Sequence, residues 1–510
     1  MKTLPMIKTI SGDVRAAFCA VAIVATALCA SADPFTYVDH WPSGTAPETA
    51  TEVVVPDNTT ATISTTEDVT RVARLTAISL GTGATVTYDS STALTLSAAL
   101  SGYGTFECVD SAGIVLSGDN SQLVSPGTFF FTNTSVIVSN RYGLGSTGTA
   151  MVKYCYGDKN GNGLLFRGPG LVVDAPITIQ ATNIAQRVVG PESVGDTLVF
   201  SNSFRIAGHN PDMKFRNKVR FAGGTFGPVA GTGSGGHLYT YKQGSYAEVW
   251  FDSGVKPTFD FWFAADIVYH LGWDDVAGCT LALSYLDSVA FICENRDLFA
   301  KFSSGIGSGN SFVGSEKIID LNGYDQTVKC LNRTYNASSS LGIVVTSAVP
   351  ATVTLKSTSD DWCKGNFQGA AALTYEGTKV NEFRTMFSAT TGPLTIKTGT
   401  FKLSEGAGWG GTNVLIKSGA ELSVDSASMP VAFGNRALQG HQSRTKLEIE
   451  SGGTLELAAS AEPAVVRTLV YDGKIMPAGL YTKTSGVGIT GDGALRVSTN
   501  GKPGLMLIFR

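Results

Sequence analysis

The fold is decided by two stretches that align without a gap, Ile416-Lys-Ser-Gly-Ala-Glu-Leu-Ser-Val424 and Ile449-Glu-Ser-Gly-Gly-Thr-Leu-Glu-Leu457. A third stretch has the same pattern, Ile489-Thr-Gly-Asp-Gly-Ala-Leu-Arg-Val497, and a fourth is one residue shorter, Ile396-Lys-Thr-Gly-Thr-Phe-Lys-Leu403. Each unit has an initial Ile, a Gly in its middle and apolar residues two apart at its end. This pattern is typical of two short strands around a turn.

A repeated unit of this kind indicates a stack, because one copy cannot bury its apolar face alone. Period-two alternation then places Ile416, Leu422 and Val424 in the interior and Lys417 toward solvent. Gly419 is expected to supply the corner conformation that a side chain resists. The alternative is a set of independent β-hairpins in a sandwich.

The composition favours the same class of fold. Of 510 residues 59 are Gly and only 16% are charged, which suits many short strands and turns and disfavours coiled coils. The formal net charge is −4, so a basic nucleic-acid-binding protein is not expected. We therefore predict an all-β fold.

Several further motifs resemble a known family. They are Ile318-Ile-Asp-Leu-Asn-Gly-Tyr-Asp-Gln-Thr-Val328 and Tyr471-Asp-Gly-Lys-Ile-Met-Pro-Ala-Gly-Leu-Tyr481, together with the Ser-Gly-Ala-x-Leu and Ser-Gly-Gly-Thr-Leu units. They resemble secreted bacterial proteins with autotransporter-associated β-strand repeats. The resemblance implies a right-handed parallel β-helix, or β-solenoid, at or outside the cell surface, and it brings no catalytic residues. The C-terminal translocator barrel of such proteins, a series of amphipathic strands, is not expected here.

The N-terminal segment 1–32 is predicted to be a signal peptide. A basic start is followed by the apolar run 16–28 and by Ala30-Ser31-Ala32, which fits a cleavage site. The alternative is an uncleaved anchor. We expect a secreted or cell-surface protein, in the periplasm or outside the outer membrane, with no transmembrane segment after cleavage.

The rest of the chain is expected to form four regions. They are a leader with the first strand (33–69), an N-terminal β-repeat region (70–190), an aromatic-rich β insertion or sandwich-like module (191–309) and C-terminal β-solenoid repeats (310–510). Six cysteines follow the signal: Cys108, Cys155, Cys279, Cys293, Cys330 and Cys363. Their even number permits up to three disulfides, with Cys279–Cys293 as the expected pair.

The aromatic-rich module contains the candidate binding site. Eleven aromatic residues lie between Tyr239 and Trp273, including Trp250, Trp262 and Trp273. Aspartates are interleaved, and Asp274 and Asp275 follow directly. Rings beside carboxylates offer a sugar a stacking face and hydroxyl acceptors, so these five residues predict a glycan-binding site. The alternative is that the aromatic rings form the core of the module.

Two further motifs are weaker indications of a functional site. Asp274 and Asp275 resemble a paired-carboxylate site of a polysaccharide hydrolase, but adjacent residues on a strand point to opposite faces. The segment from Asp158 to Gly163 matches half of a calcium loop, although a tight hairpin turn explains its Asn and Gly residues equally well. No catalytic residue, metal site or cofactor is predicted.

Two hypotheses about function follow. The first is an exported, non-catalytic surface β-solenoid, an adhesin or a structural component of the cell envelope that binds a glycan or a surface protein. The second is a secreted protein that binds or degrades a polysaccharide through residues 239–275. An open groove lined by Trp250, Trp262 or Trp273 beside paired carboxylates would favour the second, whereas buried rings would favour the first.

Overall fold

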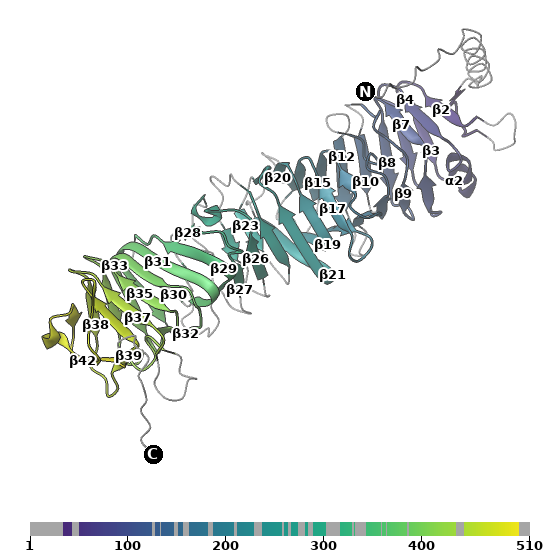
Figure 1. The fold of residues 1–510 in the computed structure, drawn as a ribbon. Coiled ribbons are helices and arrows are strands. Elements are labelled where there is room, and N and C mark those ends of the chain that lie inside the picture. Colours follow the sequence, from purple (N-terminus) through teal and green to yellow (C-terminus); the bar gives the residue numbers. More distant parts are fainter. Residues whose placement is uncertain are drawn as a thin grey trace, which may run out of the picture.

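In the described part of the chain nearly all of the regular secondary structure is β-strand. The computed structural model describes residues 34–42, 50–124, 128–132, 134–146, 151–156, 163–181, 187–208, 212–228, 237–257, 260–263, 267–273, 281–283, 289–301, 317–328, 331, 343–358, 360–363, 365–384, 387–434 and 443–498. Figure 1 shows an elongated molecule with its strands side by side along its length. The prediction of an all-β fold is confirmed.

Two sheets of parallel strands begin in the N-terminal half. The shorter contains β1 (Phe35–Thr36), β2 (Glu52–Val55), β4 (Ala77–Leu80) and β7 (Ala99–Gly102). The longer contains β3 (Thr60–Ile63), β5 (Thr85–Tyr88), β8 (Thr105–Val109), β10 (Thr128–Thr132), β12 (Met151–Tyr156), β15 (Ile177–Ala181), β18 (Phe204–Gly208), β20 (Gly224–Pro228) and β22 (Val255–Pro257). Paired strands in the longer sheet are a short distance apart in sequence, as Thr85 and Thr105 illustrate. The chain therefore returns repeatedly to the same sheet, and we call each return a level of the stack.

A third sheet runs through the rest of the molecule as two overlapping series of parallel strands. One series contains β6 (Leu94–Leu96), β9 (Ile114–Leu116), β11 (Val136–Val138), β13 (Gly163–Phe166), β16 (Arg187–Pro191), β19 (Asp212–Phe221), β21 (His237–Phe251), β23 (Asp260–Phe263) and β25 (Leu281–Leu283). The later ends of β19 and β21 also belong to the other series, which we call the groove series: β14 (Val172–Val173), β17 (Thr197–Phe200), β24 (Val268–Leu271), β26 (Val289–Cys293), β27 (Lys317–Asp320), β29 (Ile343–Leu355) and β31 (Gly365–Arg384).

The C-terminal levels continue from β29 and β31 in the same manner. Their parallel strands are β28 (Gln326–Val328), β30 (Asp361–Cys363), β33 (Leu394–Ser404), β35 (Asn413–Ile416), β36 (Glu421–Val424), β37 (Lys446–Ile449), β38 (Thr454–Leu457), β40 (Thr468–Tyr471) and β43 (Ile489–Thr490). Short pairs join β32 (Phe387–Ser388) to β34 (Gly408–Trp409) and β39 (Ala464–Val466) to β44 (Leu495–Val497). Single-turn 3₁₀ helices span Leu298–Lys301 and Lys483–Ser485.

The repeat units stack largely in the register that their alignment predicts. Ile416 lies opposite Ile449, and Leu422 lies opposite Leu455. All four side chains are buried, because alternate residues of each strand face the interior. Gly419 has a φ of 76° at the turn between the two strands, the left-handed conformation expected for it.

The third unit is an exception to this register. Ile489 pairs with Leu455 rather than with Ile449, which pairs with Tyr471 instead. The residues between the second and third units include β40 and an antiparallel hairpin that uses one more strand. The gapless alignment of the third unit was therefore wrong about which residues lie above one another.

Parallel pairing continues through the middle of the chain. Strand β19 pairs with β16 before it and with β21 after it, and β26 pairs with β27 across the expected boundary near residue 310. A sandwich-like module would consist of antiparallel strands in two sheets. The described strands of 191–309 instead continue the stack of their neighbours.

Both ends of the stack are covered. At the N-terminal end the helix α2 (Thr66–Val72) has Thr65 as its N-cap and buries Val69 and Val72. The indole of Trp41 is buried beside it and donates to the Thr62 carbonyl at 2.9 Å. At the C-terminal end β41 (Lys474–Ile475) and β42 (Gly479–Tyr481) pair antiparallel to β40 and β44. A helix or antiparallel strands at the end of a stack limit the edge-to-edge association of strands between molecules.

The predicted signal peptide, residues 1–32, lies outside the described residues. In the part of the chain that the structure describes, no helix has the length and apolar character needed to cross a membrane.

Ion pairs link successive levels on the outer faces. Lys397 Nζ lies 2.6 Å from Glu376 Oε1, and Lys356 Nζ lies 3.5 Å from Glu376 Oε2. The hydrogen bond from Lys397 and the two positive charges hold the pKa of Glu376 below its usual value. Glu421 has the opposite shift, since burial and the neighbouring Glu456 raise its pKa.

Replacing Leu455 by Asp is expected to destabilise the C-terminal levels by about 3–5 kcal/mol, because the carboxylate enters an apolar interior without a partner. The measurement is thermal unfolding followed by circular dichroism. Leu480→Asp serves as the matched control, since Leu480 is 59% exposed. Equal melting temperatures for the two variants would contradict the interior position of Leu455.

Acid should remove the contribution of Glu376 to stability. Its folded pKa lies below the unfolded value of 4.5, so the stabilisation is present above that pH and is lost as the pH falls through the folded pKa. Glu376→Gln is therefore expected to lower the melting temperature at pH 7 and to have a smaller effect as the pH falls toward 3. For Glu421 the sign is reversed, so Glu421→Gln should not destabilise at pH 7. A Glu376→Gln effect that persists unchanged at pH 3 would contradict the ion-pair explanation.

Candidate functional site

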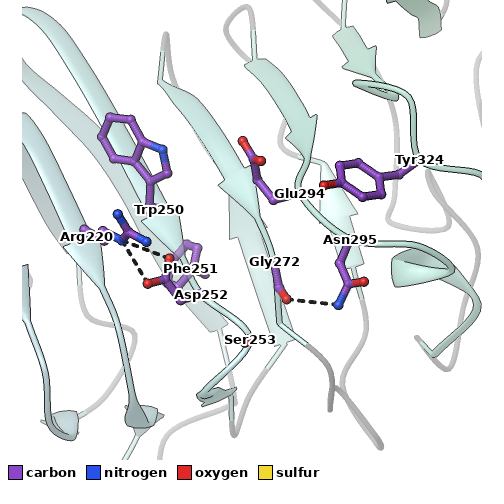
Figure 2. A pocket seen from close by; sticks show the side chains of 9 residues that line it. All are labelled: Arg220, Trp250, Phe251, Asp252, Ser253, Gly272, Glu294, Asn295 and Tyr324. Carbon is purple, nitrogen blue, oxygen red and sulfur yellow. Dashed lines mark hydrogen bonds and ion pairs between the residues drawn. The ribbon is translucent and has the colours of Figure 1, made fainter. Parts of the chain in front are cut away.

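An open groove of about 830 Å³ lies on the outer side of the groove series. This volume is in the range of small-molecule sites, ~300–1,000 Å³. Figure 2 shows its lining, with Trp250 at one end, Tyr324 at the other and Glu294 and Asn295 between them. The residues that line it are Arg220, Trp250, Phe251, Asp252, Ser253, Gly272, Glu294, Asn295 and Tyr324.

The lining follows from strand register. Arg220 on β19 lies opposite Trp250 on β21, and Trp250 lies opposite His270 on β24. His270 in turn lies opposite Ile292 on β26. Alternation directs these positions outward while Phe251 and its neighbours fill the interior. The groove is formed where these strands end and the chain turns.

Gly272 keeps the centre of the groove open. It follows the last residue of β24, and its amide donates to the Phe251 carbonyl at 2.7 Å. A Cβ at this position would lie 2.9 Å from that carbonyl oxygen and 3.6 Å from Glu294 Cβ. A side chain here would therefore crowd the backbone and fill the space between Asp252 and Glu294.

Trp250 presents its ring beside the groove. The indole stacks on the His270 imidazole with centroids 4.5 Å apart and planes 15° apart. The Lys218 ammonium lies 6.0 Å from the indole centroid on the neighbouring strand, within the range of a cation–π contact. His270 therefore covers one face of the ring, whereas Lys218 lies at the limit of contact, and the side chain as a whole is half-buried rather than enclosed.

His270 links two carboxylates across three strands. Its Nε2 lies 2.6 Å from Glu248 Oε1, and its Nδ1 lies 2.6 Å from Glu294 Oε1. A ring nitrogen that carries a proton donates it to the carboxylate oxygen beside it. The histidine side chain is only 12% exposed, so the contacts fix its ring as a platform under Trp250.

The two ends of the groove are also fixed by hydrogen bonds. Arg220 Nε donates to both Asp252 oxygens, at 3.1 and 2.8 Å. At the other end Asn295 Nδ2 donates to the Gly272 carbonyl at 3.4 Å. Tyr324 is 37% exposed, so its ring is accessible to a ligand. The groove therefore combines two accessible aromatic rings with carboxylate and amide groups.

The structure separates the predicted tryptophans. Trp273 is completely buried. It extends an interior ladder of aromatic rings, whose centroids are 5.4 Å apart for Phe200 and Phe221, 5.3 Å for Phe221 and Phe251, and 5.0 Å for Phe251 and Trp273. The prediction that Trp273 binds a glycan is therefore wrong. Trp273 follows the interior residue Leu271 by two positions, and its side chain enters the same core. The alternative, an aromatic core, holds for this residue.

The remaining predicted positions are not part of the described site. Trp262 lies on β23 opposite Tyr239, in a different series from Trp250, and its side chain is outside the described part of the structure. Asp274 and Asp275 lie outside the described residues, as does the calcium-loop candidate from Asp158 up to Gly163, which begins β13. Among the described side chains no cluster of three or more His, Cys, Asp or Glu residues could hold a metal ion.

The predicted Cys279–Cys293 disulfide is wrong. Cys293 is free and fully buried at the end of β26, where alternation directs it into the core beside Phe291. Burial raises the pKa of its thiol. Cys108 is also free and buried, while Cys279 lies outside the described residues. Closeness in sequence was a poor guide to disulfide pairing, because residues of one level that are close in sequence need not be close in space.

Several residues of the groove were not predicted. They come from different levels, except that Glu294 and Asn295 are adjacent in the chain: Arg220, Glu248, His270, Glu294, Asn295 and Tyr324. The contacts between them join residues more than 20 positions apart, for example 22 for His270 with Glu248 and 24 for His270 with Glu294. The only signal in the sequence is the recurrence of polar residues at outward positions, which requires the register to be known first.

Comparison with known proteins found no match to this chain among family models, curated proteins or solved structures.

Replacing His270 by Gln is expected to lower the free energy of unfolding by about 1–3 kcal/mol, because Glu248 and Glu294 lose the group that holds them together. The loss should be larger at low salt, where the carboxylates repel each other more strongly. Chemical denaturation at two salt concentrations measures both effects. His40→Gln is the control, since the His40 side chain is 56% exposed. A His270→Gln effect as small as that of His40→Gln would contradict this role.

Proposed function

We propose that this protein is an exported, non-catalytic right-handed β-helix that acts at the cell surface, as an adhesin or a component of the cell envelope, and that it binds a glycan in the groove beside Trp250. The single observation that carries the glycan-binding proposal is the half-buried Trp250 ring at the edge of an open groove that also presents Glu294 and Asn295.

The chemistry of the lining favours a sugar. The flat faces of a sugar ring pack on aromatic side chains, while its hydroxyl groups donate to carboxylate and amide oxygens. Trp250 offers the first kind of contact, and Glu294 and Asn295 offer the second. An apolar ligand would displace water from these polar groups without offering them a hydrogen bond in return, which is costly.

The arrangement favours binding over cleavage. Hydrolysis of a glycosidic bond uses one carboxylic acid as proton donor and a second carboxylate as base or nucleophile. In this groove Asp252 is held by Arg220, and Glu294 is held by His270. Both carboxylates are thus already engaged by side chains of the protein, and neither is free to act as the second group of such a pair.

The proposals of a β-helix and of a surface location rest on different observations. The parallel register of the levels supports the β-helix, together with the repeat units that resemble autotransporter-associated repeats. Export rests on the sequence of residues 1–32, which has the features of a signal peptide. The strands β19, β21, β26 and β27, at which the groove is formed, lie in the middle of the elongated molecule and away from either end (Figure 1).

The test is a glycan array probed with the chain from Asp33 onward, with and without calcium. Trp250→Ala is expected to abolish specific binding, since it removes the stacking face. The matched control is Trp362→Ala, because Trp362 is also half-buried and also lies by a cation, Arg384 at 5.0 Å, but it is not part of the groove.

Each result of the array has a clear meaning. Binding that is lost in Trp250→Ala and kept in Trp362→Ala would support the proposal. Binding that survives in Trp250→Ala would overturn the assignment of the groove, and silence across the array would overturn glycan binding altogether. If the unmodified chain released shorter glycans and Glu294→Gln did not, the function would be cleavage rather than binding alone.

A further inference from the structure

The groove runs along the stack rather than around it. Its lining is taken from consecutive strands of the groove series, from Arg220 on β19 to the turn that follows β27 and contains Tyr324. Neighbouring strands are about 4.8 Å apart, so five of them span roughly 19 Å from first to last. A site of this length and direction suits an extended molecule better than a single sugar.

The contacts are distributed along that length. Trp250 and Tyr324 lie at the two ends, and the hydrogen-bonding groups Glu294 and Asn295 lie between them (Figure 2). The side-chain-free position at Gly272 leaves the middle open. A ligand that reaches both rings must therefore pass over the polar groups in between.

The charges of the lining limit the chemistry of the ligand. Among the described residues that line the groove Arg220 is the single cation, and it already binds both oxygens of Asp252. Glu294 is exposed at the groove and its Oε2 also accepts from Asn322 at 3.4 Å. An anionic sugar would find no unpaired counter-ion here and would approach Glu294 at an electrostatic cost. Neutral hydroxyl and acetamido groups would meet acceptors instead.

We propose that the ligand is an uncharged linear oligosaccharide that lies along the long axis of the molecule, with one sugar ring on Trp250, another on Tyr324 and at least one between them on Glu294 and Asn295. This inference rests on the proposed glycan-binding function and adds the length, direction and charge class of the ligand.

The experiment is isothermal titration calorimetry with the chain from Asp33 onward. The probes are oligomers of one to six units from cellulose, chitin, xylan and mannan, with oligogalacturonides as the anionic comparison. Affinity is expected to rise at least about tenfold from the disaccharide to the tetrasaccharide, since only longer chains reach both rings, and to change little beyond.

Variants at the two ends test the direction of the ligand. Tyr324→Ala is expected to weaken binding of the hexamer by about threefold to tenfold, as the loss of one ring contact implies, and to leave the disaccharide that binds at Trp250 unaffected. The matched control is Tyr103→Ala, since Tyr103 is 49% exposed and is not part of the groove.

The possible failures can be told apart. If monosaccharides bind as tightly as tetramers, or if Tyr324→Ala leaves the hexamer unaffected, the extended site is wrong while glycan binding stands. If oligogalacturonides bind more tightly than every neutral oligomer, the uncharged class is wrong. If no oligomer binds, the proposed function fails and this inference fails with it.

Discussion

The backbone hydrogen bond between parallel strands of neighbouring levels is the contact on which the rest of this structure depends. It fixes Ile396 opposite Ile416 and Ile416 opposite Ile449, so apolar side chains meet in the interior from one of these units to the next. The apolar interior follows from this register, since alternate residues of each strand are enclosed. The outer face follows as well, and with it the row from Arg220 to Trp250 to His270.

The groove is a consequence of register combined with one missing side chain. Without the pairing of β21, β24 and β26 the residues Trp250, His270 and Glu294 would not meet, because each belongs to a different level. Without Gly272 the space between Asp252 and Glu294 would be filled. The ion pairs in the row hold the functional side chains in fixed positions, which reduces the entropy lost when a ligand binds. Binding on such a surface needs no movement of the stack.

The sequence was informative where local pattern determines structure. The period-two alternation placed Ile416, Leu422 and Val424 inside, and Gly419 at a corner, because these features depend on neighbours within one unit. The repeat pattern gave the wrong register for Ile489, because the hairpin before it adds a strand that the periodicity does not predict. Of the predicted tryptophans, Trp250 lines the groove, whereas Trp273 is part of the interior ladder. Partners such as Glu294 are determined by lengths of turns between levels, and a composition pattern contains no such information.

The direction of the hydrogen bonds between levels has a mechanical consequence. These bonds point along the long axis of the molecule (Figure 1), from each strand to the next. Tension applied between the two ends therefore loads the contacts of one interface after another instead of shearing many strands at once. Such a rod should lengthen under load by releasing single levels from an end, at low and nearly constant force, and the covered ends formed by α2 and by β42 are where that unravelling would begin.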